Sequence, residues 1–194
     1  MTQTNVTTSS STKVLEDAET APEPDSLPTD HLWEYPKGNQ LELIIADARW
    51  QAHIDDALKQ DVAQLVLFVH ELIEEPSFAA CLRWTDDSEM QQLNSQFRDK
   101  DKATNVLSFP DDEISDNGMM RIGDLAFGFE TMAEEASQMG ITISAHMRHL
   151  IIHGLLHLIG FDHEDEEDGE EMEALEIAAL SVIGVENPYL GELA

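Results

Sequence analysis

The chain reads HLIIHGLLHLIGFDH at residues 149–163, a stretch that combines an apolar helical pattern with regularly spaced histidines. Each residue of a helix advances by about 100°, so His153 and His157 project from one face, one turn apart. Gly160 can adopt a left-handed backbone conformation that ends the helix and turns the chain back. His163 can then supply a third ligand, and three neutral imidazoles that leave one coordination position open are typical of a catalytic zinc site.

The spacing of these histidines, H-x3-H-x2-G-x2-H, resembles that of the metzincin proteases. Those proteases carry a glutamate directly after the first histidine, where it acts as the general base. In this chain that position is Gly154, which cannot accept a proton. The stretch therefore predicts the metal site of a hydrolase other than a protease, and a zinc peptidase remains the weaker alternative.

Length and cysteine content limit the class of protein. The chain has 194 residues, which suits a single domain and a tail, and its one cysteine, Cys81, excludes an intrachain disulfide. No apolar run approaches the roughly 20 residues of a membrane span. The N-terminal start, MTQTNVTTSSSTK, has neither the apolar core of a signal peptide nor an arginine. We therefore expect a cytoplasmic protein without a membrane partner.

The charge balance is strongly acidic, with a formal net charge of −30 from 40 acidic residues against 10 lysines and arginines. Such a surface repels nucleic acid on average, which argues against a broad basic-patch binder and against DNA as a partner. Arg98, Lys100 and Lys102 nevertheless lie within five positions. An arginine fork matches phosphate oxygens, and lysines add charge, so this loop predicts local anion binding. A solvated turn in which Asp99 and Asp101 neutralise the lysines is equally open.

Apolar periodicity predicts the secondary structure of residues 41–183. The expected strands are residues 41–45, 77–84, 106–109 and 122–129. The expected helices are residues 55–73, 86–97, 131–139, 144–159 and 166–183, with Thr131 and Ser144 as N-terminal caps of the third and fourth. Short connections between mixed elements predict an α+β fold with a small mixed four-stranded sheet and about five helices packed against it. The metal site is then expected on a C-terminal helix and the loop that follows it.

The two ends of the chain are predicted to differ. Residues 1–40 are rich in Ser, Thr, Pro and acids and lack an apolar period, which predicts a disordered tail ahead of a folded domain at residues 41–194. The last helix is strongly acidic, and most of its acids are expected to face solvent. Its expected inward residues are Met172, Leu175, Ala179 and Val182.

Four motifs occur in order along the chain: LNSQFRDK at residues 93–100, TNVLSFP at 104–110, GDL at 123–125 and HGLLHLIGFDH at 153–163. Together they resemble the YbeY family of bacterial endoribonucleases, also called rRNA maturation factors, and the likeness extends over residues 41–183. The chain departs from the family pattern at Ala103, where proline is common, and in its acidic N-terminal tail.

The resemblance implies a single-strand-specific, metal-dependent endoribonuclease domain at residues 41–194. Such an enzyme acts in ribosomal RNA maturation, notably at the 3′ end of the small-subunit RNA, and in ribosome quality control, together with the ribosome or a ribosomal protein. By the matching motifs, His153, His157 and His163 are the expected zinc ligands and Arg98 is the expected catalytic residue. The expected substrate-binding residues are Arg98, Lys100, Lys102 and His149.

Three points stay open at the level of sequence. One zinc ion is expected, but imidazole also binds nickel, copper and iron. Attack on phosphorus by water and attack by the ribose 2′-hydroxyl are both compatible with these residues. A ribosome-assembly factor in which zinc only braces the fold is an alternative to the enzyme.

Overall fold

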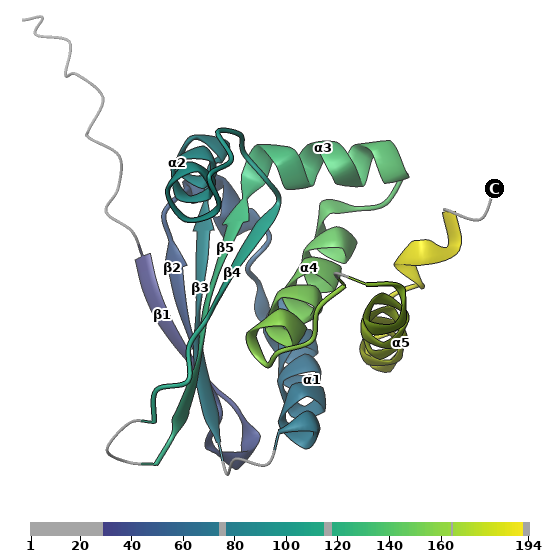
Figure 1. The fold of residues 1–194 in the computed structure, drawn as a ribbon. Coiled ribbons are helices and arrows are strands. Elements are labelled where there is room, and N and C mark those ends of the chain that lie inside the picture. Colours follow the sequence, from purple (N-terminus) through teal and green to yellow (C-terminus); the bar gives the residue numbers. More distant parts are fainter. Residues whose placement is uncertain (1–28, 74–76, 115–117, 164, 192–194) are drawn as a thin grey trace, which may run out of the picture.

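The computed structural model describes residues 29–73, 77–114, 118–163 and 165–191, and these form an α+β fold around one mixed sheet (Figure 1). The five strands are β1 (Thr29–Glu34), β2 (Gln40–Ile45), β3 (Phe78–Thr85), β4 (Val106–Pro110) and β5 (Met120–Gly128). Their order in the sheet is β1-β2-β3-β5-β4. The central strands β2, β3 and β5 are parallel, and the edge strands β1 and β4 run antiparallel to their neighbours.

The prediction of four strands is wrong, because the sheet has a fifth strand at one edge. This strand, β1, falls within the segment predicted as a disordered tail, and it pairs with β2 from Thr29 opposite Ile45 to Glu34 opposite Gln40. Trp33 and Tyr35 are 8% and 7% exposed, so this part of the predicted tail packs into the core. The composition of the first 40 residues as a whole concealed a short strand at their end. Residues 1–28 of the predicted tail lie outside the described part of the chain.

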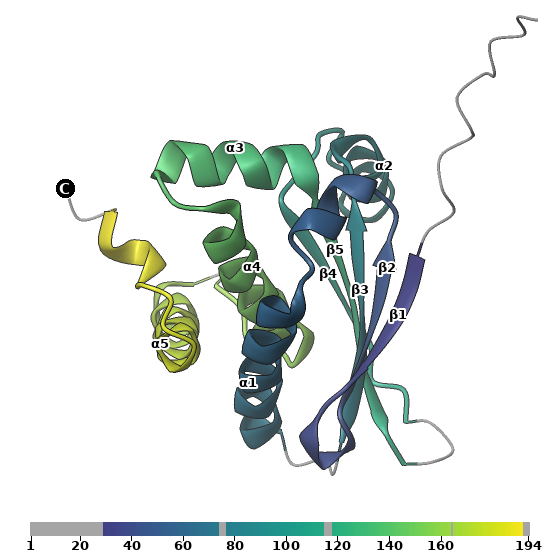
Figure 2. The ribbon, with the colours of Figure 1, turned by 180° about the vertical axis from the view of Figure 1, so that it is seen from behind.

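The expected number of helices agrees with the described structure. The helices are α1 (Asp56–Leu72), α2 (Asp87–Arg98), α3 (Phe129–Met139), α4 (Ile143–Leu158) and α5 (Glu166–Val182), with short 3-10 turns at Pro36–Gly38, Ala48–Ala52 and Pro188–Gly191. Helices α1 and α4 cover one face of the sheet, and α5 lies on the far side of α4 (Figures 1 and 2). Within the described ranges, none of the helices is both long enough and apolar enough to cross a membrane.

Side chains alternate between the two faces of the sheet along each strand, so the sheet lies between two apolar layers. Leu125 and Phe127 of β5 face the main core beneath α1 and α4, together with Leu82 and Trp84 of β3. Ala126, between them, faces the other side of the sheet, where a smaller cluster with Met90 and Leu107 packs under α2. Because side chains alternate between faces along a strand, β4 directs Ser108 to the α4 side and Leu107 to the α2 side. The edge strand β4 therefore separates α2 from α4 and contacts both.

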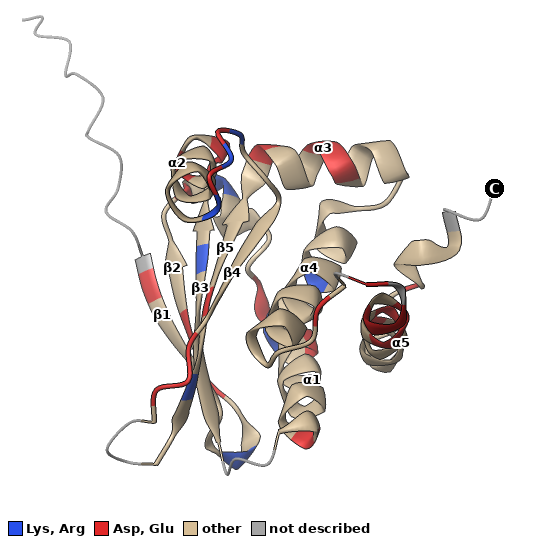
Figure 3. Ribbon diagram, viewed as in Figure 1, with Lys and Arg blue, Asp and Glu red and all other residues tan. Residues whose placement is uncertain are grey.

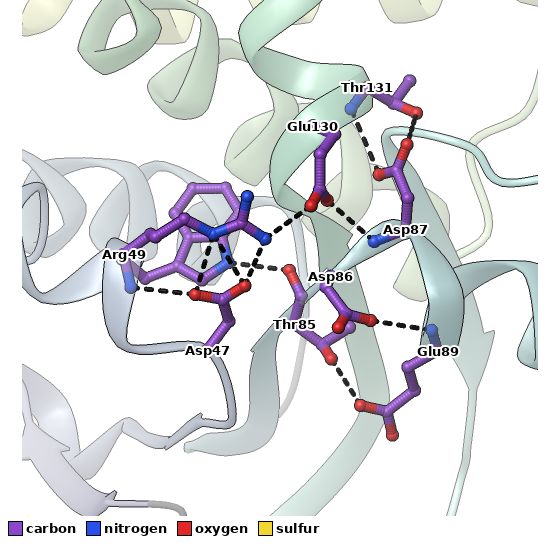
Figure 4. Close-up of polar contacts among 9 residues, drawn as sticks. Asp47, Arg49, Thr85, Asp86, Asp87, Glu89, Glu130 and Thr131 are labelled. Carbon is purple, nitrogen blue, oxygen red and sulfur yellow. Dashed lines mark hydrogen bonds and ion pairs between the residues drawn. The ribbon is translucent and has the colours of Figure 1, made fainter. Parts of the chain in front are cut away.

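The N-terminal caps of α3 and α4 differ from those predicted. Helix α3 begins at Phe129, and Asp87 of α2 accepts hydrogen bonds from the backbone nitrogen and hydroxyl of Thr131, at 3.1 and 2.7 Å. In return, Glu130 accepts a hydrogen bond of 2.9 Å from the backbone nitrogen of Asp87, so the two helix starts cap each other (Figure 4). Thr142, rather than Ser144, caps α4. The cap of α3 leaves no local pattern in the sequence, because it comes from another helix.

Candidate functional site

Three histidines meet where α4 ends. His153 and His157 lie on α4, and Gly160, with φ +98°, follows the end of that helix and lets the chain turn toward His163. One ring nitrogen from each histidine can be chosen so that all three atoms lie within 4.8 Å of one another. Nitrogens that share a zinc ion lie at most about 4 Å apart, because each Zn–N bond is about 2.0–2.1 Å long. A modest rotation of the side chains is therefore enough for one ion to bind all three.

The hydrogen bonds of two of these histidines leave the correct nitrogen free for a metal. The Nδ1 atom of His157 lies 2.9 Å from the carbonyl oxygen of Phe161, which can only accept, so Nδ1 carries the proton. The Nδ1 atom of His153 lies 2.8 Å from Oε1 of Glu176. A carboxylate also accepts, so in both rings Nε2 keeps a lone pair. Metal-binding histidines in proteins commonly donate their other nitrogen in this way.

The charge states of the surrounding groups favour a cation. Burial alone would raise the pKa of Glu176, but hydrogen bonds from His149, His153 and Tyr189 outweigh it and lower this pKa to about 2. Glu176 is therefore ionised. Burial, together with repulsion from His153 and His163, lowers the pKa of His157 and keeps this imidazole neutral. A neutral imidazole is the form that binds a metal. The donor set and its charges thus fit a transition-metal ion.

Glu176 was not among the residues singled out from the sequence. It belongs to the acidic last helix, whose acids were expected to face solvent, yet it is 1% exposed. It lies four residues after Met172 and three before Ala179, both buried, so it occupies the inward stripe of α5. An acid on an apolar stripe was the signal that could have revealed it. Val182, predicted to face inward, is 58% exposed, and that prediction is wrong.

A cationic loop lies across the cleft from the histidines. The cleft has a volume of about 600 Å³, and its lining includes Arg98, Lys100 and the three histidines. Helix α2 ends at Arg98, and the next residue, Asp99, has a φ of +56° that turns the chain into the loop. Asn94, which is buried, donates a hydrogen bond of 2.8 Å to the carbonyl oxygen of Lys102 and anchors the far side of the loop.

Arg98 differs from the other arginines in its partner. Four of the five arginines form ion pairs with carboxylates: Arg49, Arg83, Arg121 and Arg148. Arg98 instead donates from Nη2 to the carbonyl oxygen of Ser108 at 3.0 Å, and among the described residues no carboxylate pairs with it. In the described part of the chain, neither Asp99 nor Asp101 forms an ion pair with Lys100 or Lys102. Figure 3 shows basic and acidic residues alternating along this loop beside α2.

The remaining predicted site residues lie outside this cleft. Lys102 is exposed on the same loop, but it is not among the residues that line the cleft. His149 lies one turn before His153 and points toward α5, where its Nε2 atom is 2.7 Å from Oε2 of Glu176. His149 therefore contacts the carboxylate behind the histidine cluster, and a direct contact with a substrate remains a prediction.

Gly154 occupies the position that would carry the glutamate of a metzincin. A Cβ atom at this position would lie 2.8 Å from the side chain of Leu125 in β5, so the residue faces the sheet and lets α4 approach it closely. A glutamate here would point into the apolar core and away from the cleft. Position 154 therefore cannot supply the general base that a metzincin protease uses.

An α+β domain that joins three histidines and an arginine in one cleft has the features of a metal-dependent hydrolase. The family profile described as "YbeY: Endoribonuclease YbeY" matches residues 44–184. The chain belongs to this family, which is involved in ribosomal RNA maturation.

Individual relatives support the assignment. An "Endoribonuclease YbeY" of Chelativorans sp. strain BNC1 is 40% identical over 152 residues, which cover 77% of this chain and 92% of the relative. One of Rhodopseudomonas palustris is 38% identical over 156 residues, which cover 78% and 81%. A solution structure of a Thermotoga maritima protein is a weaker match, with a TM-score of 0.49, 22% identity and coverage of 73% of this chain and 90% of the other.

Proposed function

We propose that this protein is a cytoplasmic, single-strand-specific, metal-dependent endoribonuclease. Its proposed task is the maturation of the 3′ end of small-subunit ribosomal RNA and the quality control of ribosomes, with the ribosome or a ribosomal protein as partner. The observation that carries the proposal is the position of Arg98. In a chain with a net charge of −30, this arginine lines the same cleft as the three histidines and has no carboxylate partner among the described residues.

The metal would be held by His153, His157 and His163. The Nε2 atoms of the first two are left free by the hydrogen bonds that Nδ1 makes to Glu176 and Phe161. Zinc fits three neutral imidazoles, and nickel, copper and iron fit them as well. When bound, such an ion supplies Lewis acidity, which polarises a phosphoryl oxygen and makes water more acidic.

The cationic residues of the cleft would bind and orient the scissile phosphate. The Arg98 guanidinium has five N–H donors and directs one of them to Ser108, so the others are available to phosphate oxygens. They can also stabilise the negative charge that develops on those oxygens during cleavage. Lys100 adds a second positive charge to the lining.

The small size of the cationic area favours single-stranded RNA. A duplex binder needs a broad basic face, because neutralisation of phosphates dominates its affinity. Here two cations line a cleft of about 600 Å³ in an otherwise acidic surface, which suits a short unpaired segment. Affinity for isolated RNA is then weak, and a ribosomal partner would deliver the enzyme to its substrate.

The proposal is tested by cleavage of an end-labelled single-stranded ribosomal RNA fragment with zinc-loaded protein. Arg98→Ala should keep its fold and its zinc but lose cleavage by about 10²–10³-fold, as for removal of a group that stabilises transition-state charge. Arg83→Ala is the matched control, because Arg83 pairs with Glu89 on the opposite face of the sheet. Equal cleavage by wild type and Arg98→Ala would overturn the role of Arg98. Zinc-loaded wild type that cuts no RNA would favour the assembly-factor alternative.

A further inference from the structure

We infer that Glu176 is a positioning residue, which holds His153 from behind so that the Nε2 atom of this histidine faces the cleft. The inference rests on the proposed function in one respect, because it takes His153 as a metal ligand. The inference adds Glu176 of α5 and Tyr189 of the C-terminal turn to the site. The other residues of the site come from α2, β4, α4 and the loop that follows α4.

The first observation is the cost of placing this carboxylate in the core. Glu176 is 1% exposed and lies on α5 among the buried residues Met172, Ala179 and Leu180. A buried charge is strongly unfavourable unless it is paired and hydrogen-bonded, and an apolar residue of similar volume is often as stable or more so. Packing alone would therefore favour leucine or methionine at this position.

The second observation is the way in which the two carboxylate oxygens are used. Oε2 accepts hydrogen bonds from Nε2 of His149, at 2.7 Å, and from the hydroxyl of Tyr189. Oε1 accepts from Nδ1 of His153, at 2.8 Å. Two donors on one oxygen fix the plane of the carboxylate, and the other oxygen then points at the histidine of the candidate metal site.

Tyr189 brings a third segment of the chain into this arrangement. It lies in the 3-10 turn Pro188–Gly191, after the end of α5, and its ring packs edge-on against His149 with 5.7 Å between the centroids. The carboxylate is thus held by donors from α4 and from the C-terminal turn. A group that only filled space on α5 would not need anchors from both.

The consequence for His153 is a fixed tautomer. With Nδ1–H donated to Glu176, the lone pair of His153 is on Nε2, and the ring cannot rotate without breaking a charge-assisted hydrogen bond. His157 donates to a weaker, neutral partner, the carbonyl of Phe161, and the nearest Asp162 oxygen lies 3.9 Å away, beyond hydrogen-bond distance. Among the contacts of the three histidines with described residues, the Glu176 carboxylate on His153 is the strongest. Loss of such a partner typically lowers metal affinity by about 10–100-fold.

The experiment compares Glu176→Gln with Glu173→Gln, a matched change at an exposed position of the same helix. The glutamine keeps the volume of Glu176 but presents only one accepting oxygen. Two readouts are needed: the zinc affinity, from competition with a chromogenic chelator, and the ring tautomers of the metal-free protein, from long-range ¹H–¹⁵N NMR. Thermal unfolding reports on the fold of each variant.

We expect Glu176→Gln to bind zinc about 10–100-fold more weakly and to lose the uniform Nδ1–H tautomer of His153, while Glu173→Gln behaves as wild type. Wild-type zinc affinity and an unchanged His153 tautomer, with or without a lower melting temperature, would overturn the inference. If Glu176→Gln does not fold, Tyr189→Phe gives the same test, because it frees one side of the carboxylate without burying an amide. It should weaken zinc binding in the same direction, and unchanged affinity would count against the inference.

Failure of this inference differs from failure of the proposed function. A wild type that binds zinc but cuts no RNA would remove the enzymatic proposal, and the affinity and tautomer measurements on Glu176 would still stand. Conversely, Glu176→Gln protein with wild-type zinc affinity would remove the positioning role, while RNA cleavage that depends on Arg98 would remain.

Discussion

Arg98 donates a hydrogen bond from Nη2 to the carbonyl oxygen of Ser108, 3.0 Å away, and so ties the end of α2 to the edge strand β4. A carbonyl orients the guanidinium without cancelling its charge, in contrast to the carboxylates that pair with Arg49, Arg83, Arg121 and Arg148. The arginine is thus held at the cleft in a form that can still bind an anion.

Replacement of Arg98 by lysine separates the charge of this residue from its geometry. Lysine keeps a positive charge but has no planar fork, so it cannot hold Ser108 and a phosphate in the same manner. We expect Arg98→Lys to cleave single-stranded RNA with a kcat between those of wild type and Arg98→Ala. Single-turnover kinetics of the three proteins would check this, and wild-type kcat in Arg98→Lys would show that charge alone is sufficient.

Gly154 tests whether the peptidase pattern can be restored by one substitution. Gly154→Glu recreates the dipeptide of a zinc protease, but its side chain would meet Leu125 at 2.8 Å and place a charge in the core. We expect a loss of about 3 kcal/mol or more in the free energy of unfolding and no proteolytic activity. Urea denaturation and a casein assay measure the two effects. Ala174→Glu, at an exposed position of α5, is the control and should change stability by less than about 0.5 kcal/mol.

The parts of the site that the sequence predicted are those that local geometry determines. His153, His157 and His163 could be identified because a helical period and a glycine place them together within eleven residues. The Arg98 loop was visible as a local cluster of cations, but its unpaired state depends on Ser108, from another strand. Glu176 and Tyr189 reach the site only through the packing of α5 and of the C-terminal turn, 23 and 36 residues after His153.

The same distinction explains the fold. The α-helices and the strands β2 to β5 were predicted because each has a strong apolar period of its own. Strand β1 was missed because its place at the sheet edge depends on pairing with β2, and the surrounding composition is that of a tail. The cap of α3 was missed because it comes from Asp87 of another helix (Figure 4).

The ionised state of Glu176 makes part of the stability dependent on pH. Its pKa is lowered from 4.5 to about 2 in the folded protein, so the stability that it contributes is present above about pH 4.5. That contribution is lost as the pH falls from 4.5 toward 2, because the folded protein then takes up the proton later than the unfolded chain. Urea denaturation of metal-free wild type and Glu176→Gln between pH 6 and pH 3 measures it. The stability difference between the two should shrink toward low pH, and a constant difference would contradict the assigned pKa.

The reciprocal caps of α2 and α3 predict coupled losses of stability. Glu130 accepts from the backbone nitrogen of Asp87 at 2.9 Å, and Asp87 accepts from that of Thr131 at 3.1 Å. Removal of either cap, in Asp87→Ala or Glu130→Ala, should cost about 1 kcal/mol of unfolding free energy. Since the two residues share one network, the double variant should deviate from additivity by about 0.5 kcal/mol or more.

Glu134→Ala is the control for these caps, because Glu134 lies three residues after Thr131, the spacing of a local capping box. In the structure its carboxylate instead accepts a hydrogen bond of 3.0 Å from Gln138, on the exposed surface of α3. Its loss should change the unfolding free energy by less than about 0.5 kcal/mol. Because the backbone nitrogen of Thr131 already donates to Asp87 of α2, it is not available to Glu134. A Glu134→Ala variant as destabilised as Glu130→Ala would therefore support the local capping box and contradict the reciprocal caps.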